Sequence, residues 1–178
     1  RLSMIILGAG NFARKEFIKG ILFLLSEFTF IGIMVSEGFH ALYMMISLGE
    51  KVTGEVFNEK TQVYEYAMGD NSMLILLYGV ITFFAIFGFI IIWRAGVKSA
   101  YKAQVKKEQS KHIPTFLEEM KTYSDSCIHK TLLFFPIMGV IIFTVMPLVF
   151  MMSMAFTNYD RDHQPPGNLF HWVGLVNF

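Results

Sequence analysis

Two uninterrupted apolar stretches dominate the pattern of hydrophobic and polar positions along the chain. Residues 73–93 contain no charged side chain over 21 positions, and residues 132–156 contain none over 25. A helix of 21 residues is about 31 Å long, which matches the hydrocarbon core of a bilayer. Two such stretches leave too little polar chain to wrap them as buried helices of a soluble protein. We therefore predict transmembrane helices at 73–93 and 131–156.

A third apolar stretch, at residues 20–46, is interrupted by polar side chains. It contains Glu27, Glu37 and His40. A carboxylate such as that of Glu27 costs about 2.5–3.5 kcal/mol at the centre of a membrane helix. The stretch is nevertheless long enough to span, and we predict a first transmembrane helix at 20–46. The predicted fold class is an all-α membrane protein with three transmembrane helices, an N-terminal interfacial segment at 1–19 and a helical cytoplasmic loop.

The composition agrees with a membrane protein and narrows the possible functions. Hydrophobic residues make up 54% and charged residues 16% of the chain, against about 45–50% and 25% in soluble domains. The net charge of +1 argues against a nucleic-acid partner, which needs a concentrated basic surface. A single cysteine, Cys127, excludes an intrachain disulfide and a zinc-binding thiolate cluster. No nucleophile–base pair is evident, so we predict no enzyme, no cofactor and no metal site.

The charges alternate from one side of the predicted spans to the other. Residues 1–19 have four basic and one acidic residue, a balance of +3, and residues 94–130 have eight and four, a balance of +4. Residues 47–72 have two basic and five acidic residues, a balance of −3, and residues 157–178 have one and two, a balance of −1. By the positive-inside rule, the N-terminus and the 94–130 loop are cytoplasmic, and the loops at 47–72 and 157–178 are outside.

The basic loop at 94–130 follows the interfacial Trp93 and begins as a helix that leaves the bilayer along the cytoplasmic surface. Its lysines either contact anionic lipid headgroups, at about 1 kcal/mol each, or form a solvated charged face. After Pro114, the spacing of Thr115 and Glu118 predicts a short helix that starts with a capping box. In the N-terminal segment, Lys19 is expected to extend back to the headgroup layer.

The N-terminal stretch also contains the pattern Gly8-x-Gly10-x-x-Ala13, which is typical of dinucleotide-binding folds. Such a fold requires repeated strand–helix units, and the helix after this turn is apolar on every side. The alternative hypothesis of a nucleotide-dependent oxidoreductase therefore rests on this turn alone. The interpretation that we prefer is an interfacial segment in which Gly8 and Gly10 let the backbone bend into the first span.

The C-terminal third of the chain resembles a known family. The stretch AFTNYDRDHQPPGNLFHWVGLVNF, residues 155–178, closely resembles the segment after the third helix of MalF-like permease subunits of bacterial maltose/maltodextrin ABC importers. The stretches GAGNFARKEFIKGILF and HKTLLFFPIMGVIIFTVMPLVFMMSMAFTN are similar to the opening segment and to the third helix of these permeases. The resemblance extends over nearly the whole chain and identifies it as the N-terminal portion of such a subunit.

This resemblance implies a function in carbohydrate uptake. The protein would be a multi-pass subunit of a bacterial cell-membrane transporter for malto-oligosaccharides, with its N-terminus in the cytoplasm. Its partners would be a second permease subunit, two cytoplasmic ATPase subunits that hydrolyse ATP, an extracellular solute-binding protein and the lipid bilayer. Further helices beyond residue 178 would contain the sugar-contacting residues and the ATPase-docking loop. The alternatives left open are the oxidoreductase and a small membrane scaffold protein.

The external loop at 157–178 leads to the missing helices and contains the candidate site residues. We expect it to be a contact surface for an extracellular partner, with Asn158, Tyr159, Asp160, His163 and Trp172 as candidate residues. Asp160, Asp162 and His163 have too few companion ligands for a cation site. A solvated turn is therefore the expected structure there.

Overall fold

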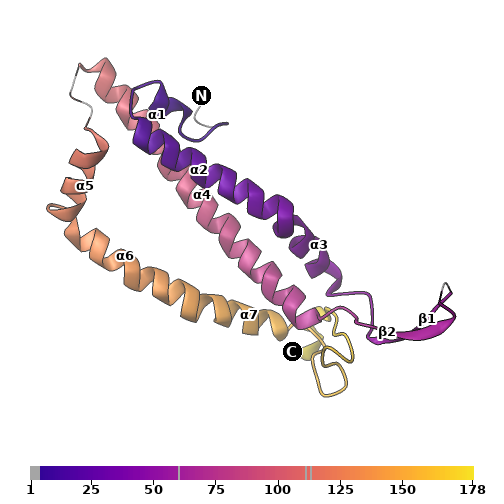
Figure 1. Cartoon of the computed structure of the whole chain (residues 1–178). Coiled ribbons are helices and arrows are strands. Elements are labelled where there is room, and N and C mark those ends of the chain that lie inside the picture. Colours follow the sequence, from indigo (N-terminus) through magenta and orange to yellow (C-terminus); the bar gives the residue numbers. More distant parts are fainter. Residues whose placement is uncertain (1–4, 60, 111, 113) are drawn as a thin grey trace. The chain divides into compact units, whose positions relative to one another are not determined.

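Three long helices account for most of the chain (Figure 1). The computed structural model describes residues 5–59, 61–110, 112 and 114–178. The first helix consists of α2 (Phe17–Ile33), a π-helical turn (Met34–Gly38) and α3 (Phe39–Ser47), and the second is α4 (Ser72–Glu108). The third consists of α6 (Ile128–Val140), a π-helical turn (Ile141–Val145) and α7 (Met146–Met154). By length and composition, all three could cross a membrane, which confirms the predicted fold class.

The third helix contains both prolines that the sequence places in a span. Pro136 lies inside α6, and Pro147 lies in the first turn of α7, directly after the π-helical turn. Proline has no backbone N–H and its ring displaces the carbonyl one turn earlier, so the ladder of hydrogen bonds must adjust nearby. A single π turn next to Pro147 is such an adjustment.

Helix α4 continues well beyond the predicted span. It is one helix of 37 residues from Ser72 to Glu108, about 55 Å long, so the first part of the basic loop extends the second helix without a break. Helix α5 (Phe116–Ser124) follows. Its capping box is confirmed: the Glu118 backbone N–H donates to Thr115 Oγ1 (3.4 Å), and the Thr115 N–H donates to Glu118 Oε2 (3.0 Å).

The chain divides into two compact units, each of which is described by itself. The first unit comprises residues 1–35 and 85–141, and the second comprises residues 36–84 and 142–178. In the first unit, α2 lies beside the part of α4 that begins at residue 85. There the rings of Phe30 and Phe89 stack with their centroids 3.9 Å apart. The short helix α1 (Ala9–Phe12) folds back against α2 (Figure 1).

The glycine-rich turn of the first unit lets the N-terminal segment pack closely against α2 and α4. Gly8 has φ +86°, and a Cβ atom on it would lie 2.3 Å from the carbonyl oxygen of Gly20 in α2. A Cβ atom on Gly96 of α4 would lie 2.5 Å from a methyl carbon of Leu7, which is 1% exposed. Only glycine permits such close backbone approach together with positive φ. The turn therefore joins the N-terminal segment to the helices, and it follows no strand in the described part of the chain, contrary to the dinucleotide hypothesis.

Glu27 contributes to this same packing. Its Oε2 accepts a hydrogen bond of 2.9 Å from the backbone N–H of Leu7, twenty residues earlier. The carboxylate thereby satisfies a backbone donor of the turn, which would otherwise be costly to bury. The polar residue that interrupts the first apolar stretch thus has a structural role within the first unit.

Lys19, which we expect from the sequence to extend back to the headgroup layer, is buried in an ion-pair cluster. Its Nζ lies 2.7 Å from Glu16 Oε1 and 2.8 Å from Glu119 Oε1, and its side chain is 7% exposed. A buried ammonium needs such carboxylate partners, because desolvation otherwise costs several kcal/mol per ion. The cluster links the start of α2 to α5.

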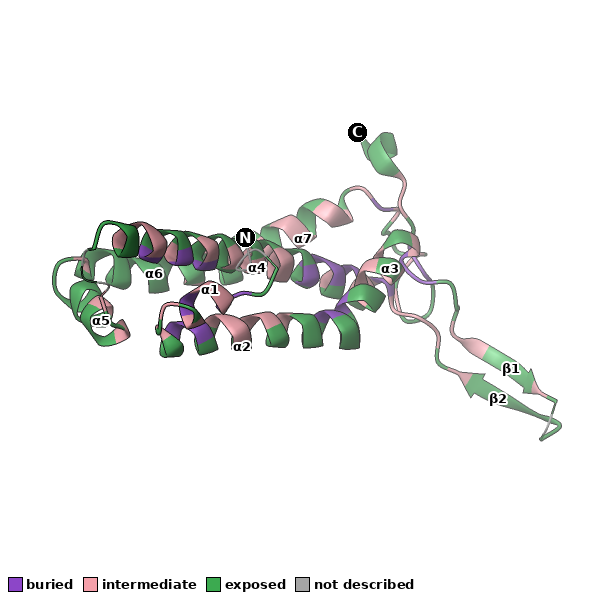
Figure 2. Cartoon of the chain, turned by 90° about the horizontal axis from the view of Figure 1, so that it is seen from above, coloured by how far each residue is buried: buried purple, intermediate pink, exposed green. Residues whose placement is uncertain are grey.

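The second unit contains a β-hairpin that we did not predict from the sequence. Strands β1 (Gly54–Asn58) and β2 (Val63–Ala67) pair antiparallel, with Phe57 opposite Tyr64. The alternating Val, Phe and Tyr residues favour strands, but the segment is short and lies in a loop that we interpreted only by its charge. Most residues of the hairpin are exposed, as the green strands of Figure 2 show.

The core of the second unit is small and is formed by Leu48, Leu76 and Phe170, each 0% exposed. Met45 of α3 packs closely on α4, because Gly79 presents no side chain there: a Cβ atom at this position would lie 2.3 Å from the Met45 sulfur. Phe170 comes from the C-terminal loop, so this loop completes the core. The fold thus holds the candidate contact loop firmly against α3 and α4.

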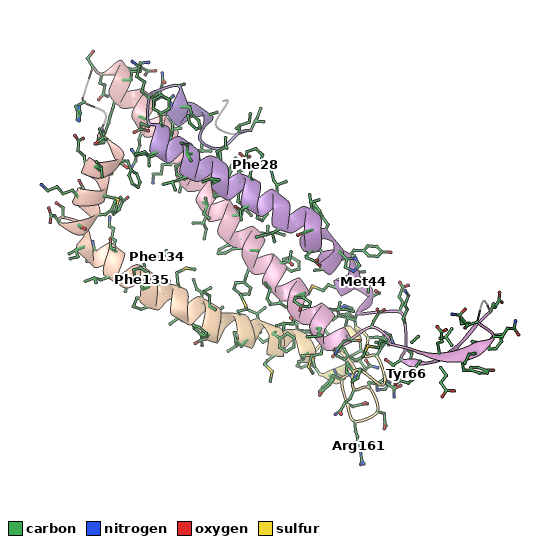
Figure 3. The ribbon with its side chains drawn as sticks, in the orientation of Figure 1. Phe28, Met44, Tyr66, Phe134, Phe135 and Arg161 are labelled. Atoms are coloured by element: carbon green, nitrogen blue, oxygen red, sulfur yellow. The ribbon has the colours of Figure 1, made fainter. Side chains whose placement is uncertain are left out.

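Large apolar side chains cover the outer surfaces of the long helices. Figure 3 shows Phe28 on α2 and Phe134 and Phe135 on α6 extending from the ribbon, and they are 64%, 56% and 71% exposed. In the third helix, no residue of the most apolar stretch of 18 residues is buried. Continuous apolar surfaces of this extent are rare on soluble monomers and indicate contact with lipid or with other helices.

Candidate contact surface in the C-terminal loop

The loop after α7 is folded, and hydrogen bonds join its beginning to its end. Thr157 and Trp172 form an isolated antiparallel bridge. Next to it, the Asn158 N–H donates to the His171 carbonyl (3.1 Å), and the His171 N–H donates to Asn158 Oδ1 (2.6 Å). Asn177 Nδ2 donates to the carbonyls of Thr157 (2.7 Å) and Ala155 (3.0 Å). The two ends of the loop are therefore joined at its base.

The tip of the loop is organised by Asp160. Its Oδ1 accepts hydrogen bonds from the backbone N–H groups of Asp162 and His163, both at 2.9 Å, and lies 2.7 Å from His163 Nδ1. The hydrogen bond from the His163 side chain, followed by those from the two backbone amides, lowers the pKa of Asp160 below its ordinary value. The expected solvated turn is thus a compact Asx-type turn, and Arg161 extends from it in Figure 3.

Trp172 attaches the loop to α3. Its Nε1 donates a 2.8 Å hydrogen bond to the carbonyl of Met45, which is one of the last four carbonyls of α3 and has no partner within its own helix. The half-buried indole ring also packs against the core. On the other side of the loop, Tyr159 contacts Phe170 edge to face, with ring centroids 5.6 Å apart.

A cavity of about 620 Å³ lies between this loop and the chain segment that follows α3. Its polar lining consists mainly of Glu50, Asp162, His163, Asn168 and His171. Carboxylate, imidazole and amide groups together offer both donors and acceptors. The cavity therefore combines hydrogen-bonding groups with apolar lining residues such as Val52 and Leu169, which suits mixed contacts with a partner.

The five predicted residues divide into two groups in the structure. Asn158, Asp160 and Trp172 form hydrogen bonds within their own unit, and Tyr159 packs on Phe170. Only His163 lines the cavity. The sequence did not indicate Glu50 or His171, because their proximity depends on how the loop returns to α3. Across the described ranges, no group of three or more His, Cys, Asp or Glu residues is arranged to hold a metal ion.

Replacing Trp172 with phenylalanine tests the attachment of the loop. The change keeps an aromatic ring but removes the donor to the Met45 carbonyl, and we expect a loss of about 1 kcal/mol. Hydrogen exchange of the loop amides should then accelerate by about fivefold. Tyr159→Phe is the matched control, because it retains the ring contact with Phe170 and should leave the exchange rates unchanged. Equal rates in both variants would contradict the anchoring role.

Acidification should open the tip of the loop. Because the pKa of Asp160 lies below its ordinary value of about 3.9, the ionised carboxylate stabilises the turn above about pH 4. This contribution is lost as the pH falls through the lowered pKa. Amide exchange at His163, measured by NMR, should therefore rise in that range. Asp160→Asn should abolish this transition, whereas Asp162→Asn should retain it, since the structure gives the Asp162 carboxylate no bond within the described turn.

The three apolar helices and the folded loop define a helical, multi-span membrane protein. Over 99% of its length the chain is similar to permease proteins of sugar transport systems. It is 29% identical over 181 residues to the galactooligosaccharides transport system permease protein GanP of Bacillus subtilis (strain 168). It is 27% identical to the maltodextrin transport system permease protein MalC of Streptococcus pneumoniae and 26% identical to MdxF of Bacillus subtilis, each over 178 residues.

The chain covers less than half of each of these relatives. It spans 39% of the length of GanP and 38% of the lengths of MalC and MdxF. No family model matches the sequence. No solved structure matches it either. The similarity to sugar transport permeases thus rests on the sequence alignments.

Proposed function

We propose that the chain is part of the membrane-spanning permease subunit of an ABC importer that takes up malto-oligosaccharides. The observation that supports this proposal is similarity to sugar transport permeases over 99% of the chain, two of which are maltodextrin permeases. Three helices able to cross a membrane agree with it. The chain itself performs no hydrolysis in this proposal. A second permease subunit and two cytoplasmic ATPase subunits complete the transporter, and an extracellular binding protein delivers the sugar.

Galacto-oligosaccharides are a second candidate substrate class, because the similarity to GanP extends over the same share of the chain. Both classes are neutral, hydroxyl-rich sugars. They differ in the geometry of their glycosidic bonds. A permease would distinguish them through the side chains that line its pathway and contact the sugar. The two candidates are therefore separated by transport measurements.

The transport proposal is tested by deleting the whole gene in its host. Uptake of radiolabelled maltotriose should fall to background and return with the gene on a plasmid, while uptake of a β-linked galactotriose should be unchanged. The opposite pattern would favour the galacto-oligosaccharide. Unchanged uptake of both sugars, in a host without a redundant importer, would rule out the proposed function.

We propose that the segments are arranged as the charges indicate. Residues 1–19 and 94–130 lie on the cytoplasmic side, residues 47–72 and 157–178 lie outside, and the spans are 20–46, 73–93 and 131–156. The balances of +3 and +4 against −3 and −1 support this orientation. The cavity of the C-terminal loop then faces outward, where His163 and its neighbours are available to the binding protein.

Thiol labelling on intact cells tests the orientation. In a Cys127→Ser background, single cysteines replace Gln109 and Thr61, which are both exposed. A membrane-impermeant maleimide should label Thr61→Cys at once and Gln109→Cys only after the cells are opened. If only Gln109→Cys were labelled in intact cells, the proposed orientation would be contradicted and the opposite one supported.

A further inference from the structure

The first unit contains a basic cavity that the proposed transport function does not use. It has a volume of about 630 Å³ and lies among α2, the second half of α4, α5 and the start of α6. Sites for small molecules and cofactors have volumes of about 300–1,000 Å³. Five lysines and two glutamates line it, a balance of +3. The excess positive charge indicates that the ligand is an anion.

The lysines in this cavity differ in how their charges are compensated. Lys19 is paired with both glutamates, Glu16 and Glu119. No carboxylate lies within ion-pair distance of the remaining four anywhere in the described ranges. These four lysines, which we name the lysine cluster, are Lys98, Lys102, Lys106 and Lys130. Four unpaired ammonium groups around one cavity repel each other, and an anion bound among them would relieve this repulsion.

The lysine cluster combines positive charges from two helices, α4 and α6. Lys98, Lys102 and Lys106 follow each other at intervals of four residues, so they lie on one face of α4. Like charges at this spacing destabilise a helix slightly. Lys130 lies in the first turn of α6, and Ser99 and Tyr123, which both have hydroxyl groups, are among the residues that line the same cavity. The arrangement offers several donors to one small anionic group.

The position of the cluster relative to the apolar stretches identifies the source of the anion. Lys98 comes five residues after the apolar stretch at 73–93, and Lys130 comes two residues before the one at 132–156. Five residues of helix correspond to about 7.5 Å, which is about the depth of the headgroup layer on one side of a bilayer. Both lysines therefore lie at the level of lipid phosphates, and exposed apolar residues such as Leu132 and Leu133 continue from the cavity toward the acyl chains.

We propose that this cavity binds the phosphate headgroup of an anionic phospholipid from the leaflet on the basic side of the membrane. The lysine cluster neutralises the phosphate, and the acyl chains extend along the apolar surfaces of α4 and α6. The inference depends on neither the sugar nor the partner subunits. It favours lipid contact over a solvated face for the lysine cluster, of which Lys98, Lys102 and Lys130 are exposed.

Lipid titration monitored by native mass spectrometry tests the proposal. The purified protein in detergent is titrated with phosphatidylglycerol or with phosphatidylcholine, and the bound lipid is counted. We expect phosphatidylglycerol to bind selectively, and the triple variant K98Q/K102Q/K130Q to bind it on the order of 100-fold more weakly, since each lysine near an anionic lipid contributes roughly a factor of five. Higher salt should reduce the selectivity.

Two control variants separate the cavity from general charge. K15Q/K107Q/K121Q removes three exposed lysines outside this cavity and should bind as the unmodified protein does. K98R/K102R/K130R retains the charges and should retain the selectivity, which also shows that changes at these positions preserve the fold. Equal loss in both glutamine triples would overturn the proposal. Binding of glycerol phosphate as tight as that of the lipid would overturn it too, in favour of a soluble phosphate ligand.

Discussion

Replacing Gly8 with alanine should detach the N-terminal segment from the first unit. The residue has φ +86°, and its new Cβ atom would lie 2.3 Å from the Gly20 carbonyl oxygen and 3.0 Å from its carbon. Positive φ costs an alanine about 1–2 kcal/mol, and overpacking adds about 1–3 kcal/mol. Because the obstacle is backbone, a rotating side chain cannot relieve it. We expect a loss of about 2–5 kcal/mol in the docking of this segment.

Limited proteolysis measures this loss directly. Arg14 is half-buried and its guanidinium donates to Gln104 Oε1, at 2.6 Å from Nη2. When the segment detaches, trypsin should cleave after Arg14 at least tenfold faster. Gly32→Ala is the matched control, because a Cβ atom at Gly32 would meet nothing within 4 Å. That change should leave cleavage unaffected and favour the helix by about 1 kcal/mol. Unchanged cleavage in Gly8→Ala would show that the close packing is not needed.

Replacing Lys19 with methionine should release α5 from α2. The ammonium group lies 2.7 Å from Glu16 and 2.8 Å from Glu119, so its removal leaves two carboxylates facing each other, with Glu16 almost fully buried. Breaking a buried ion pair by removing one partner costs about 3–5 kcal/mol, and the contact that holds α5 loses less, because the side chain of Glu119 is 41% exposed. Hydrogen exchange of the α5 amides should therefore accelerate, while the exchange of α4 stays slow.

The triple variant E16Q/K19M/E119Q gives the decisive comparison. It removes the buried cation together with both carboxylate charges, so that no uncompensated charge is left at the site. We expect α5 protection to return to within a few-fold of the original. If the triple variant is as poorly protected as K19M, packing of the lysine stem, not its charge, holds α5.

The membrane spans and the capping box were predictable, because each depends on residues that are close in the sequence. The 21 and 25 uncharged positions in the second and third spans determine their partition into lipid without any tertiary contact. Thr115 and Glu118 lie within one helical turn, so their reciprocal hydrogen bonds form locally. The resemblance of residues 155–178 to sugar permeases likewise required no structure.

The interactions that join distant segments could not be derived from the pattern alone. The contacts of Gly8 with Gly20, of Lys19 with Glu119 and of Trp172 with Met45 connect residues that are 12, 100 and 127 positions apart. A glycine pattern cannot reveal whether a phosphate or another backbone approaches it, and a lysine near a span can face either lipid or carboxylates. The sequence by itself determined which segments are long and apolar enough to cross a membrane, because hydrophobicity is a property of the segment. Only the tertiary structure decided which polar groups pair within each unit and which lysines remain unpaired around the cavity, because pairing depends on where the folded backbone places them.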